Sequence, residues 1–576
     1  MDYRKKFKQW VDFCDMDEEL SQELNQISCS EEAIANHFAG ELAFGTGGIR
    51  GKMGAGTLRM NIYIVRKVTA GLAHYLISTQ RSPISVAIAF DTRHNSDRFA
   101  QETASVLAYY GIKAILFSEP TPTPLLSFAV RHLGASGGVV ITASHNPPAD
   151  NGYKVYGSDG GQITDEMASA ITGQILQVEN ELTVPAMDME EAKKRDLIKW
   201  VPKDVAERYF VHLGELSFSS NWHTGGPLPV RVVYTPLHGT GARFIPKALK
   251  NAGITDLFPV PEQMKTDPSC PTVKHPNPED WDVFELAIAL AETKEADLIM
   301  ATDLDADRLG AVVRDFKQGY VPLTGNQMGC LILDYILSQR KQRGDLPDNG
   351  LMVQTVVTSQ MGKVIAEAYG VEVVETLTGF KYIGEQIKER VDSGRNVFLF
   401  GYEESYGYLA GDFVRDKDGI QASQLVAEIT AFYKNQGMTL LDALEQLYRI
   451  HGYFQEALIN RDLAENDLTR VDQVMSCLRS IELSQMTDPR IIQVNDYLNR
   501  ISYNLITGEY TPIDLPSSNS LKYTLEGNAW FCVRPSGTEP KIKIYLGIRE
   551  ENRRKADEKI VSLKESILRL KGLFHE

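Results

Sequence analysis

Apolar positions along the middle of the chain alternate between helical spacing and short continuous runs. From about residue 60 the pattern predicts a helix over 65–77 and a second helix over 98–110. Short apolar runs at 86–90, 114–117 and 139–141 are typical of buried strands, and a further helix precedes the last of them. Strands that alternate with helices predict βαβ units and a parallel sheet.

The same alternation returns after a charged segment at 190–203. "VRVVYTPLHGTG" (230–241) is interpreted as a strand and its loop, "ADLIMATD" (296–303) as another strand, and "GLMVQTVVTS" (350–359) as the start of a third set. No residue-level repeat accompanies this repeated architecture. The chain therefore predicts several α/β domains of similar, mixed-sheet construction.

The two ends of the chain have different patterns. Residues 1–40 predict polar, mildly amphipathic helices, which form an extension ahead of a glycine-rich loop. Residues 507–520 are irregular, the segment 521–548 predicts antiparallel strands, and 552–573 predicts a closing helix. We expect three α/β domains and a smaller α+β C-terminal domain, with boundaries near residues 220, 330 and 455. The predicted domains are 1–220, 221–330, 331–455 and 456–576.

Composition and net charge exclude several classes of binding partner. The 576 residues are 43% hydrophobic and 24% charged, as in ordinary globular proteins. A net charge of -16 argues against nucleic acid or an anionic membrane as the main partner. Six scattered cysteines without a CxxC pair indicate a reducing compartment and argue against zinc. With no secretory signal and no long apolar run, we expect a cytoplasmic protein; the sequence predicts no particular oligomeric state.

Three aspartates alternate in "ATDLDADRLG" (301–310), directly after an apolar strand. Carboxylates in such a tight loop can converge on a hard cation such as Mg²⁺. An EF-hand does not fit, because its sixth position needs Gly and its twelfth Glu, whereas Arg308 and Arg314 stand there. An acidic turn or helix cap is the structural alternative. Arg308 could reach a substrate phosphate. The aspartates are Asp303, Asp305 and Asp307.

A small polar cluster follows the strand in "VVITASHNPPADNGYK" (139–154). A plain turn would account for it, because Asn-Pro marks turns. Alternatively, Ser144 is held at the carboxyl end of the strand because it carries out chemistry there. Lys154 lies a few residues further on. The loop alone does not decide between these interpretations.

Three further loops carry candidate chemistry. In "VRPSGTEPKIKIY" (533–545), a guanidinium, two hydroxyls and glycine-permitted N–H groups suit a phosphate, although "PSGT" is also ordinary turn chemistry. In "FGYEESYGY" (400–408), Glu403 and Ser405 would share a face if the segment is extended, and could bind sugar hydroxyls; a surface loop is the alternative. "FGTGGIRGKMGAG" (44–56) favours a flexible anion loop with Arg50 in reach, and fits neither a Walker A loop nor a Rossmann fingerprint.

Together these loops, in the order FGTGGIRG, TASHNP, TDLDADR, GYEES and RPSGT, resemble the α-D-phosphohexomutase superfamily, from about residue 40 to 545. The EES form and the N-terminal extension are most similar to its phosphoglucomutases of the phosphoglucomutase-2 / phosphopentomutase type. The resemblance implies four domains around a central cleft, a phosphoryl group carried on Ser144, and Mg²⁺ held by that phosphoserine and the three aspartates. It also places these residues around the substrate: Thr46, Arg50, His145, Lys154, Arg308, Thr378, Gly379, Glu403, Ser405, Lys417, Arg534, Ser536, Gly537 and Thr538.

One position departs from the family pattern. The metal loop usually reads Asp-Pro-Asp, and Leu304 replaces the proline here. Proline presets φ and removes one donor, so we expect the site to survive with a looser loop.

The resemblance implies a mutase that interconverts glucose 1-phosphate and glucose 6-phosphate through glucose 1,6-bisphosphate, which also serves as activator. Phosphopentomutase and phosphomannomutase activities are alternatives. A metal-dependent sugar phosphatase and a non-catalytic sugar-phosphate-binding protein are alternatives of another class. Lys154 and Lys417 are the candidate bases, each expected to have a depressed pKa beside other cations. His145 is expected to point away from Ser144 and to contact phosphate or sugar.

Overall fold

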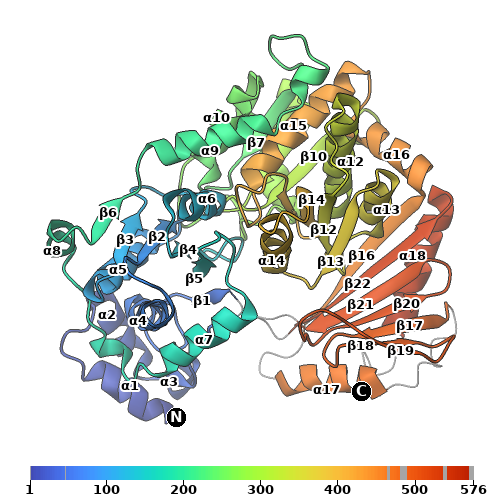
Figure 1. The fold of residues 1–576 in the computed structure, drawn as a ribbon. Coiled ribbons are helices and arrows are strands. Elements are labelled where there is room, and N and C mark those ends of the chain that lie inside the picture. Colours follow the sequence, from blue (N-terminus) through green and yellow to red (C-terminus); the bar gives the residue numbers. More distant parts are fainter. Residues whose placement is uncertain (1, 46, 463–467, 481–488, 536–540, 570–576) are drawn as a thin grey trace. The chain divides into compact units, whose positions relative to one another are not determined.

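The computed structural model describes residues 2–45, 47–462, 468–480, 489–535 and 541–569 (Figure 1). The chain divides into two compact units. The first comprises residues 1–352 and 380–440, and the second comprises residues 353–379 and 441–576.

The first unit begins with three helices and a six-stranded sheet in the order β1-β5-β4-β2-β3-β6. The helices confirm the predicted N-terminal extension. Trp10 packs edge-on against Phe38 and Tyr63, so the extension belongs to the same core as the helix that follows β1. The elements are α1 (Tyr3–Val11), α2 (Glu18–Ile27), α3 (Glu31–Phe38), β1 (Gly48–Lys52), β2 (Ser85–Phe90), β3 (Lys113–Leu116), β4 (Gly137–Ile141), β5 (Asp150–Gly157) and β6 (Ile198–Trp200).

The predicted parallel βαβ units form the centre of this sheet, and its antiparallel edge confirms the mixed-sheet prediction. β2 pairs in parallel with β3 and with β4. β5, however, runs antiparallel to both β4 and β1, so the sheet is mixed. The glycine-rich segment expected to be a flexible loop contains β1. The predicted helices and their neighbours are α4 (Ile62–Thr79), α5 (Ser96–Tyr109), α6 (Thr123–Leu133), α7 (Asp165–Leu176), η1 (Glu181–Thr183), α8 (Met189–Lys194), α9 (Asp204–Glu215) and η2 (Ser219–Asn221).

A second sheet follows in the order β11-β10-β9-β7-β8. β7 pairs in parallel with β8 and β9, and β10 turns back antiparallel to β9. The segment between β9 and β10 is the predicted three-aspartate loop. The elements are β7 (Arg231–Thr235), α10 (Gly241–Asn251), β8 (Asp256–Pro259), η3 (Trp281–Phe284), α11 (Glu285–Lys294), β9 (Leu298–Thr302), β10 (Leu309–Asp315) and β11 (Gly319–Leu323).

The third set of alternating elements starts at α12. Its helix begins with a capping box in which Thr324 and Gln327 exchange side-chain and backbone hydrogen bonds, and ends at Gly344 in the left-handed region. β14 and β15 form a tight antiparallel hairpin. The elements are α12 (Gly325–Arg343), β12 (Gly350–Thr355), α13 (Gln360–Ala368), β13 (Glu372–Thr376), α14 (Phe380–Val391), β14 (Val397–Glu403), β15 (Gly407–Leu409) and α15 (Gly419–Asn435).

The C-terminal part of the second unit is a seven-stranded antiparallel sheet in the order β16-β22-β21-β20-β17-β18-β19. This confirms the antiparallel prediction for 521–548 and, together with the α/β sets, the predicted fold class. A short strand, β19, lies within the segment expected to be irregular. The elements are α16 (Leu440–His451), β16 (Tyr453–Asp462), α17 (Leu468–Ser480), β17 (Ile491–Asp496), β18 (Ile501–Asn504), β19 (Tyr510–Pro512), β20 (Leu521–Leu525), β21 (Ala529–Pro535), β22 (Lys541–Glu550) and α18 (Arg553–Leu568).

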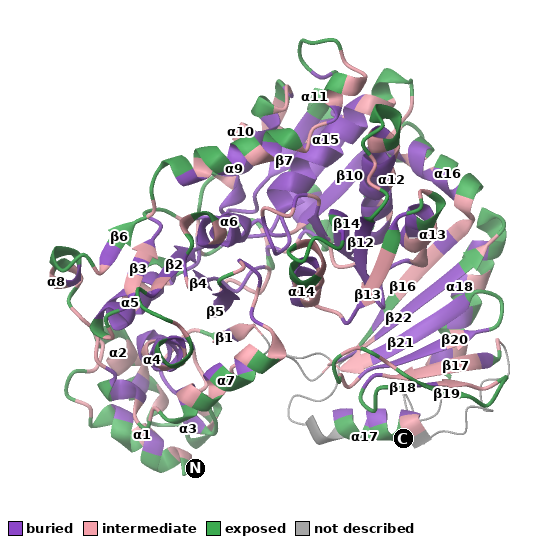
Figure 2. Cartoon of the chain, viewed as in Figure 1, coloured by how far each residue is buried: buried purple, intermediate pink, exposed green. Residues whose placement is uncertain are grey.

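Figure 2 shows that the central strands are buried along their length, and every residue of β4 and β9 is buried. Polar side chains placed at the ends of these two strands therefore sit deep in the first unit. Across the part of the chain that the structure describes, no helix combines the length and the apolar character needed to span a membrane.

Candidate functional site

Ser144 lies in a strained turn just beyond β4. Its φ of 52° is in the left-handed region, which non-glycine residues rarely adopt. Its backbone N–H donates to the Thr142 hydroxyl at 2.8 Å, and the residue is 1% exposed. Strain of this kind persists only where the surroundings impose it, and it is concentrated at functional sites.

The turn directs the Ser144 hydroxyl at the aspartate loop. Its Oγ donates to Asp303 Oδ2 at 2.7 Å and lies 3.2 Å from His145 Nδ1. The expectation that His145 points away from Ser144 was wrong, because the left-handed turn does not leave the two side chains on opposite sides. Burial, followed by the charges of Arg308 and Arg50, holds the pKa of His145 well below its ordinary value. The site thus disfavours the charged form of the imidazole beside the hydroxyl.

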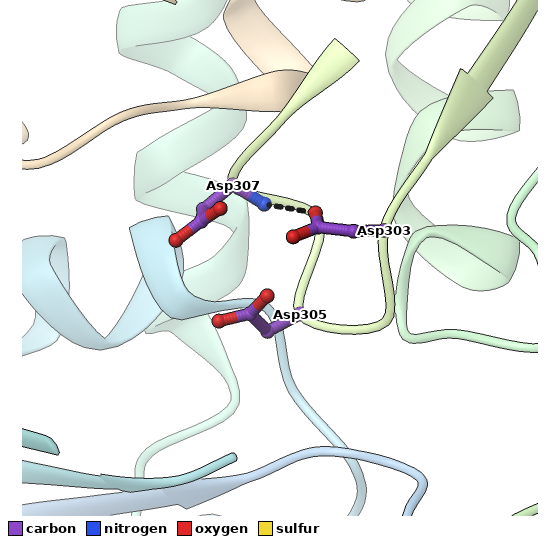
Figure 3. Close-up of side chains that lie close together, drawn as sticks. All are labelled: Asp303, Asp305 and Asp307. Atoms are coloured by element: carbon purple, nitrogen blue, oxygen red, sulfur yellow. Dashed lines mark hydrogen bonds between the residues drawn. The ribbon is translucent and has the colours of Figure 1, made fainter. Parts of the chain in front are cut away.

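The three aspartates converge as predicted. Figure 3 shows the carboxylates of Asp303, Asp305 and Asp307 turned toward one another in the loop after β9, and one oxygen from each lies within 4.8 Å of the others. Asp303 Oδ1 accepts hydrogen bonds from the backbone N–H groups of Asp307 and Arg308, each at 3.1 Å. The tight loop is closed by Ala306 with φ 51°.

This cluster fits a hard divalent cation. Among the described residues, Asp305 Oδ1 and Asp307 Oδ1 are buried without a hydrogen-bond partner, which is costly for carboxylate oxygens. Burial and the like charges of Asp307 and Asp305 raise the pKa of Asp303 well above its ordinary value. An oxygen-only donor set with unfilled lone pairs is what Mg²⁺ binds.

Leu304, the position expected to loosen the aspartate loop, is held firmly. It is fully buried, and its carbonyl accepts hydrogen bonds from both the backbone N–H and the hydroxyl of Thr240, at 2.8 and 2.9 Å. A Cβ on Gly239 would lie 2.5 Å from Leu304 Cα, so only glycine allows this approach. Residues 239–240 therefore hold the backbone at Leu304, whose φ a proline would otherwise restrict.

Both candidate lysines contact the cluster. Lys154, on β5, places Nζ 2.7 Å from Asp305 Oδ2 and 3.2 Å from Asp307 Oδ2. Lys417 Nζ lies 3.2 Å from Asp307 Oδ2 and 3.2 Å from Asp416 Oδ1. The expected depression of the Lys417 pKa was wrong: burial lowers it, but the charges of Asp307 and Asp416 outweigh burial and raise it.

Arg308 links the aspartate loop to the segment at 403–405. Its Nη1 donates to a Glu279 carboxylate oxygen and to the Ser405 carbonyl at 3.1 Å. Glu403 ends β14, whereas Ser405 lies in the turn before β15, where Tyr406 has φ 63°. The segment is thus a tight hairpin turn, and the condition for Glu403 and Ser405 to share a face of an extended strand is not met.

The remaining predicted residues are distributed over both units. Arg50, on β1, is opposite Gly152 of β5; burial lowers its pKa, opposed by the charges of Asp305 and Asp307. In the second unit, Arg534 Nη1 donates to the Thr378 hydroxyl at 2.7 Å, next to Gly379 with φ 122°. Four predicted residues lie outside the described residues: Thr46, Ser536, Gly537 and Thr538.

Three family models match successive segments: phosphoglucomutase/phosphomannomutase α/β/α domain I over residues 41–182, domain II over 207–319 and domain III over 324–450. The chain belongs to the phosphoglucomutase/phosphomannomutase family. It is 39% identical over 546 residues to a phosphoglucomutase of Staphylococcus epidermidis, covering 94% of this chain and 96% of the relative. It is 37% identical over 520 residues to a phosphoglucomutase of Staphylococcus aureus, covering 89% and 91%.

A solved structure of a phosphoglucomutase/phosphomannomutase family protein from Burkholderia thailandensis shares the fold of this family member. The TM-score is 0.64 at 17% identity, with 91% of this chain and 96% of that chain covered.

Two residues that help to build the site of this family member were not predicted from the sequence. Thr123, the first residue of α6, donates its hydroxyl to Asp305 Oδ2 at 2.8 Å. Arg93, in the loop after β2, donates to backbone carbonyls of the Ser144 turn. A signal for Arg93 was present, because "DTR" at 91–93 directly follows a buried strand, as the Ser144 and Asp303 loops do. A threonine at a helix start carries no such signal.

Proposed function

We propose that this chain is a phosphoglucomutase that interconverts glucose 1-phosphate and glucose 6-phosphate through a phosphoserine at position 144 and a glucose 1,6-bisphosphate intermediate. The 39% identity to a phosphoglucomutase over 94% of the chain supports the activity. The observation that carries the proposal is the Ser144 hydroxyl, 2.7 Å from Asp303 in a buried cluster of three carboxylates. A nucleophilic oxygen at a cation site is the arrangement that phosphoryl transfer requires.

The cofactor in this proposal is Mg²⁺. Asp303, Asp305, Asp307 and an oxygen on the Ser144 side chain would hold it. When bound, it would neutralise charge on the phosphoryl oxygens.

The chain's own residues then position the reacting groups. In the first half-reaction the bond from Ser144 Oγ to phosphorus breaks, and a bond forms from phosphorus to the free hydroxyl of the sugar monophosphate. The hydroxyl's proton passes to a lysine amine, for which Lys154 and Lys417 are the candidates because the side-chain nitrogen of each lies at the aspartate cluster, 3.2 Å from Asp307. The raised pKa of Lys417 counts against it as the base. The bisphosphate reorients, its other phosphoryl group returns to Ser144 Oγ, and the lysine returns the proton to the sugar oxygen.

Most of the barrier reduction must come from placement and charge, since phosphate monoesters are inert. The remaining roles follow the family resemblance. Arg50, His145 and Arg308 surround the substrate, together with Thr46, Thr378 and Gly379; Glu403 and Ser405 bind sugar hydroxyls; and Arg534, Ser536 and Thr538, with Gly537, hold the non-reacting phosphate. The hydrogen bond from Arg534 to Thr378 supports this last assignment, because it gathers a guanidinium and a hydroxyl at one place.

We also propose four domains with boundaries near 220, 330 and 455. The three segments matched by the family, 41–182, 207–319 and 324–450, support this division in number and order; the breaks between them, at 183–206 and 320–323, lie slightly before the proposed boundaries near 220 and 330.

A coupled assay tests the activity and the sugar. Glucose 1-phosphate, ribose 1-phosphate and mannose 1-phosphate are compared, each with Mg²⁺ and with or without glucose 1,6-bisphosphate. We expect the highest kcat/KM for glucose 1-phosphate, stimulation by the bisphosphate and no release of inorganic phosphate. Stoichiometric phosphate release would instead identify a phosphatase, and preference for ribose 1-phosphate would identify a phosphopentomutase. Intact mass should show a phosphoryl adduct that is absent from S144A.

The two lysines are compared through K154M and K417M, which keep side-chain length. A positioned base contributes about 10²- to 10⁴-fold, so we expect one variant to lose at least about 100-fold in kcat. Loss of the solvent isotope effect on kcat would distinguish the base from a lysine that only binds phosphate. Turnover near wild type in both variants would refute the assignment of either lysine as base.

A further inference from the structure

Arg93 is buried against the Ser144 turn, in the loop after β2, and is 3% exposed. Its Nη2 donates to the carbonyls of Ser144 and Asn146, each at 2.6 Å. Its Nη1 donates to the carbonyls of Pro147 at 2.7 Å and Asp150 at 2.9 Å. One guanidinium thus binds four carbonyls of a single loop, from the serine to the first residue of β5.

The guanidinium is itself fixed from behind. Arg93 Nε lies 3.3 Å from Asp91 Oδ2, an ion pair without hydrogen-bond geometry, and the backbone N–H of Arg93 donates to Asp91 Oδ1 at 2.9 Å. The Ser96 hydroxyl donates to the same Asp91 oxygen at 2.7 Å. The Asn151 amide donates to the Ser96 hydroxyl at 3.0 Å and to the His94 carbonyl at 2.9 Å, which ties the far end of the loop to the same base.

We propose that Arg93 is a positioning residue for phosphoryl transfer: it imposes the left-handed turn at Ser144 and so aims the serine oxygen at Asp303. A left-handed residue other than glycine is strained and must be held by its surroundings. Arg93 provides that restraint from the backbone side, because it binds the carbonyl of Ser144 itself and does not touch the hydroxyl. The kinetic part of this inference rests on the proposed mutase activity.

Only an arginine can bind the loop in this way. Its rigid planar fork presents several donors at once, and two of its nitrogens here serve two carbonyls each. A lysine would keep the charge beside Asp91, but its single ammonium nitrogen cannot span the same four acceptors. R93K therefore separates loop positioning from charge balance.

The first test does not depend on activity. Hydrogen exchange is measured for peptides spanning 142–152 in wild type, R93K, R93A and the control R98K. Arg98 lies on α5 and pairs with Asp17, away from the loop. The probes include the Asn146 and Asp150 amides, which donate within the loop at 3.1 and 3.0 Å. We expect exchange at least about 10-fold faster in both Arg93 variants and unchanged in R98K. Wild-type exchange in R93K would overturn the proposal.

The second test measures catalysis. A displacement of the order of 1 Å costs about 100-fold, so we expect R93K to lose at least about 100-fold in kcat while KM for glucose 1-phosphate stays within about threefold. A cavity of about 510 Å³ is lined by Arg93, Thr92 and Trp200, and gives methylguanidine a route to the site in R93A. We expect methylguanidine to restore kcat, and methylamine to have no effect.

The outcomes separate the two proposals. A wild type that fails to interconvert any sugar phosphate overturns the mutase assignment, and loop exchange alone then decides the role of Arg93. A kcat for R93K within about threefold of wild type overturns the role in catalysis. The role in catalysis is also overturned if methylguanidine restores the melting temperature of R93A but not its kcat. If R93A does not fold, S96A replaces it: loss of the hydroxyl that holds Asp91 should speed loop exchange without removing the arginine.

Discussion

Replacing Thr123 with valine should weaken cation binding, although Thr123 is not itself a candidate ligand. Thr123 is fully buried at the start of α6, and it donates twice to the aspartate loop. Its hydroxyl donates to Asp305 Oδ2 at 2.8 Å, and its backbone N–H donates to the Asp305 carbonyl at 2.9 Å. Valine keeps the shape and the backbone bond, so T123V removes one hydrogen bond to a carboxylate.

The size of the effect follows from that bond. A hydrogen bond to a charged group is worth about 1.5–3 kcal/mol, which corresponds to roughly 10- to 150-fold in an equilibrium constant. The hydroxyl fixes Oδ2 while Oδ1, which has no partner among the described residues, remains for a cation. Without it only Lys154, at 2.7 Å, holds Oδ2 within the described part of the chain, so the carboxylate is less restrained. Partners of this kind typically change metal affinity by about 10- to 100-fold.

Two measurements test this prediction: the Mg²⁺ concentration that gives half-maximal mutase turnover, and the Mg²⁺ affinity from direct titration by calorimetry. We expect the half-saturating concentration of T123V to rise at least about 10-fold, and T123S to restore it. T430V is the matched control, because Thr430 is a buried threonine whose hydroxyl donates to the Val426 carbonyl within α15. Equal Mg²⁺ affinity in T123V and wild type would refute the view that this hydroxyl orients Asp305.

Two further predictions concern stability. E181Q should lower the free energy of unfolding of the first unit by about 3–5 kcal/mol in urea denaturation, because it leaves the buried Lys6 ammonium, 2.9 Å from Glu181, without its counter-charge. The exposed Glu190 is the control: E190Q should lower the free energy of unfolding by less than about 1 kcal/mol, and equal losses in the two variants would contradict the argument. Burial raises the pKa of Asp418 to about 6, although the Tyr209 hydroxyl donates to its carboxylate at 2.7 Å. Between this pKa and the lower pKa of the unfolded chain, only the folded form binds the proton, so the stability of wild type relative to D418N should increase by about 2 kcal/mol from pH 7 to pH 4.5. A stability difference that does not depend on pH would show that the pKa of Asp418 is not raised.

How far the sequence predicts this site depends on which structural rule each residue obeys. Ser144 and Asp303 follow the apolar runs at 139–141 and 298–300, so both could be placed at the carboxyl ends of buried strands. β5 (Asp150–Gly157) was missed because it begins with Asp-Asn-Gly and carries Lys154, with no run of β-branched residues. It is nevertheless buried, since it pairs on both edges with β1 and β4.

Contacts that depend on backbone conformation lie beyond such rules. The position of His145 beside the Ser144 hydroxyl follows from a φ of 52°, and the turn at Ser405 follows from Tyr406 at 63°. Neither residue type favours that region, so neither turn is visible in the local pattern. The retained metal loop at Leu304 is similar, because its restraint comes from Thr240, more than 60 positions earlier in the chain.

Positive charge gathers at the candidate site although the chain as a whole is acidic. The protein carries a net charge of -16, yet four cations gather at the three carboxylates: Arg50, Lys154, Arg308 and Lys417. They come from β1, β5, the aspartate loop and the segment before α15, so no local stretch of sequence is strongly basic. Because Arg308 also pairs with Glu279 and Lys417 with Asp416, these cations offset the carboxylates at one buried place without giving a net positive charge. This local balance is a property of the assembled loops more than of composition.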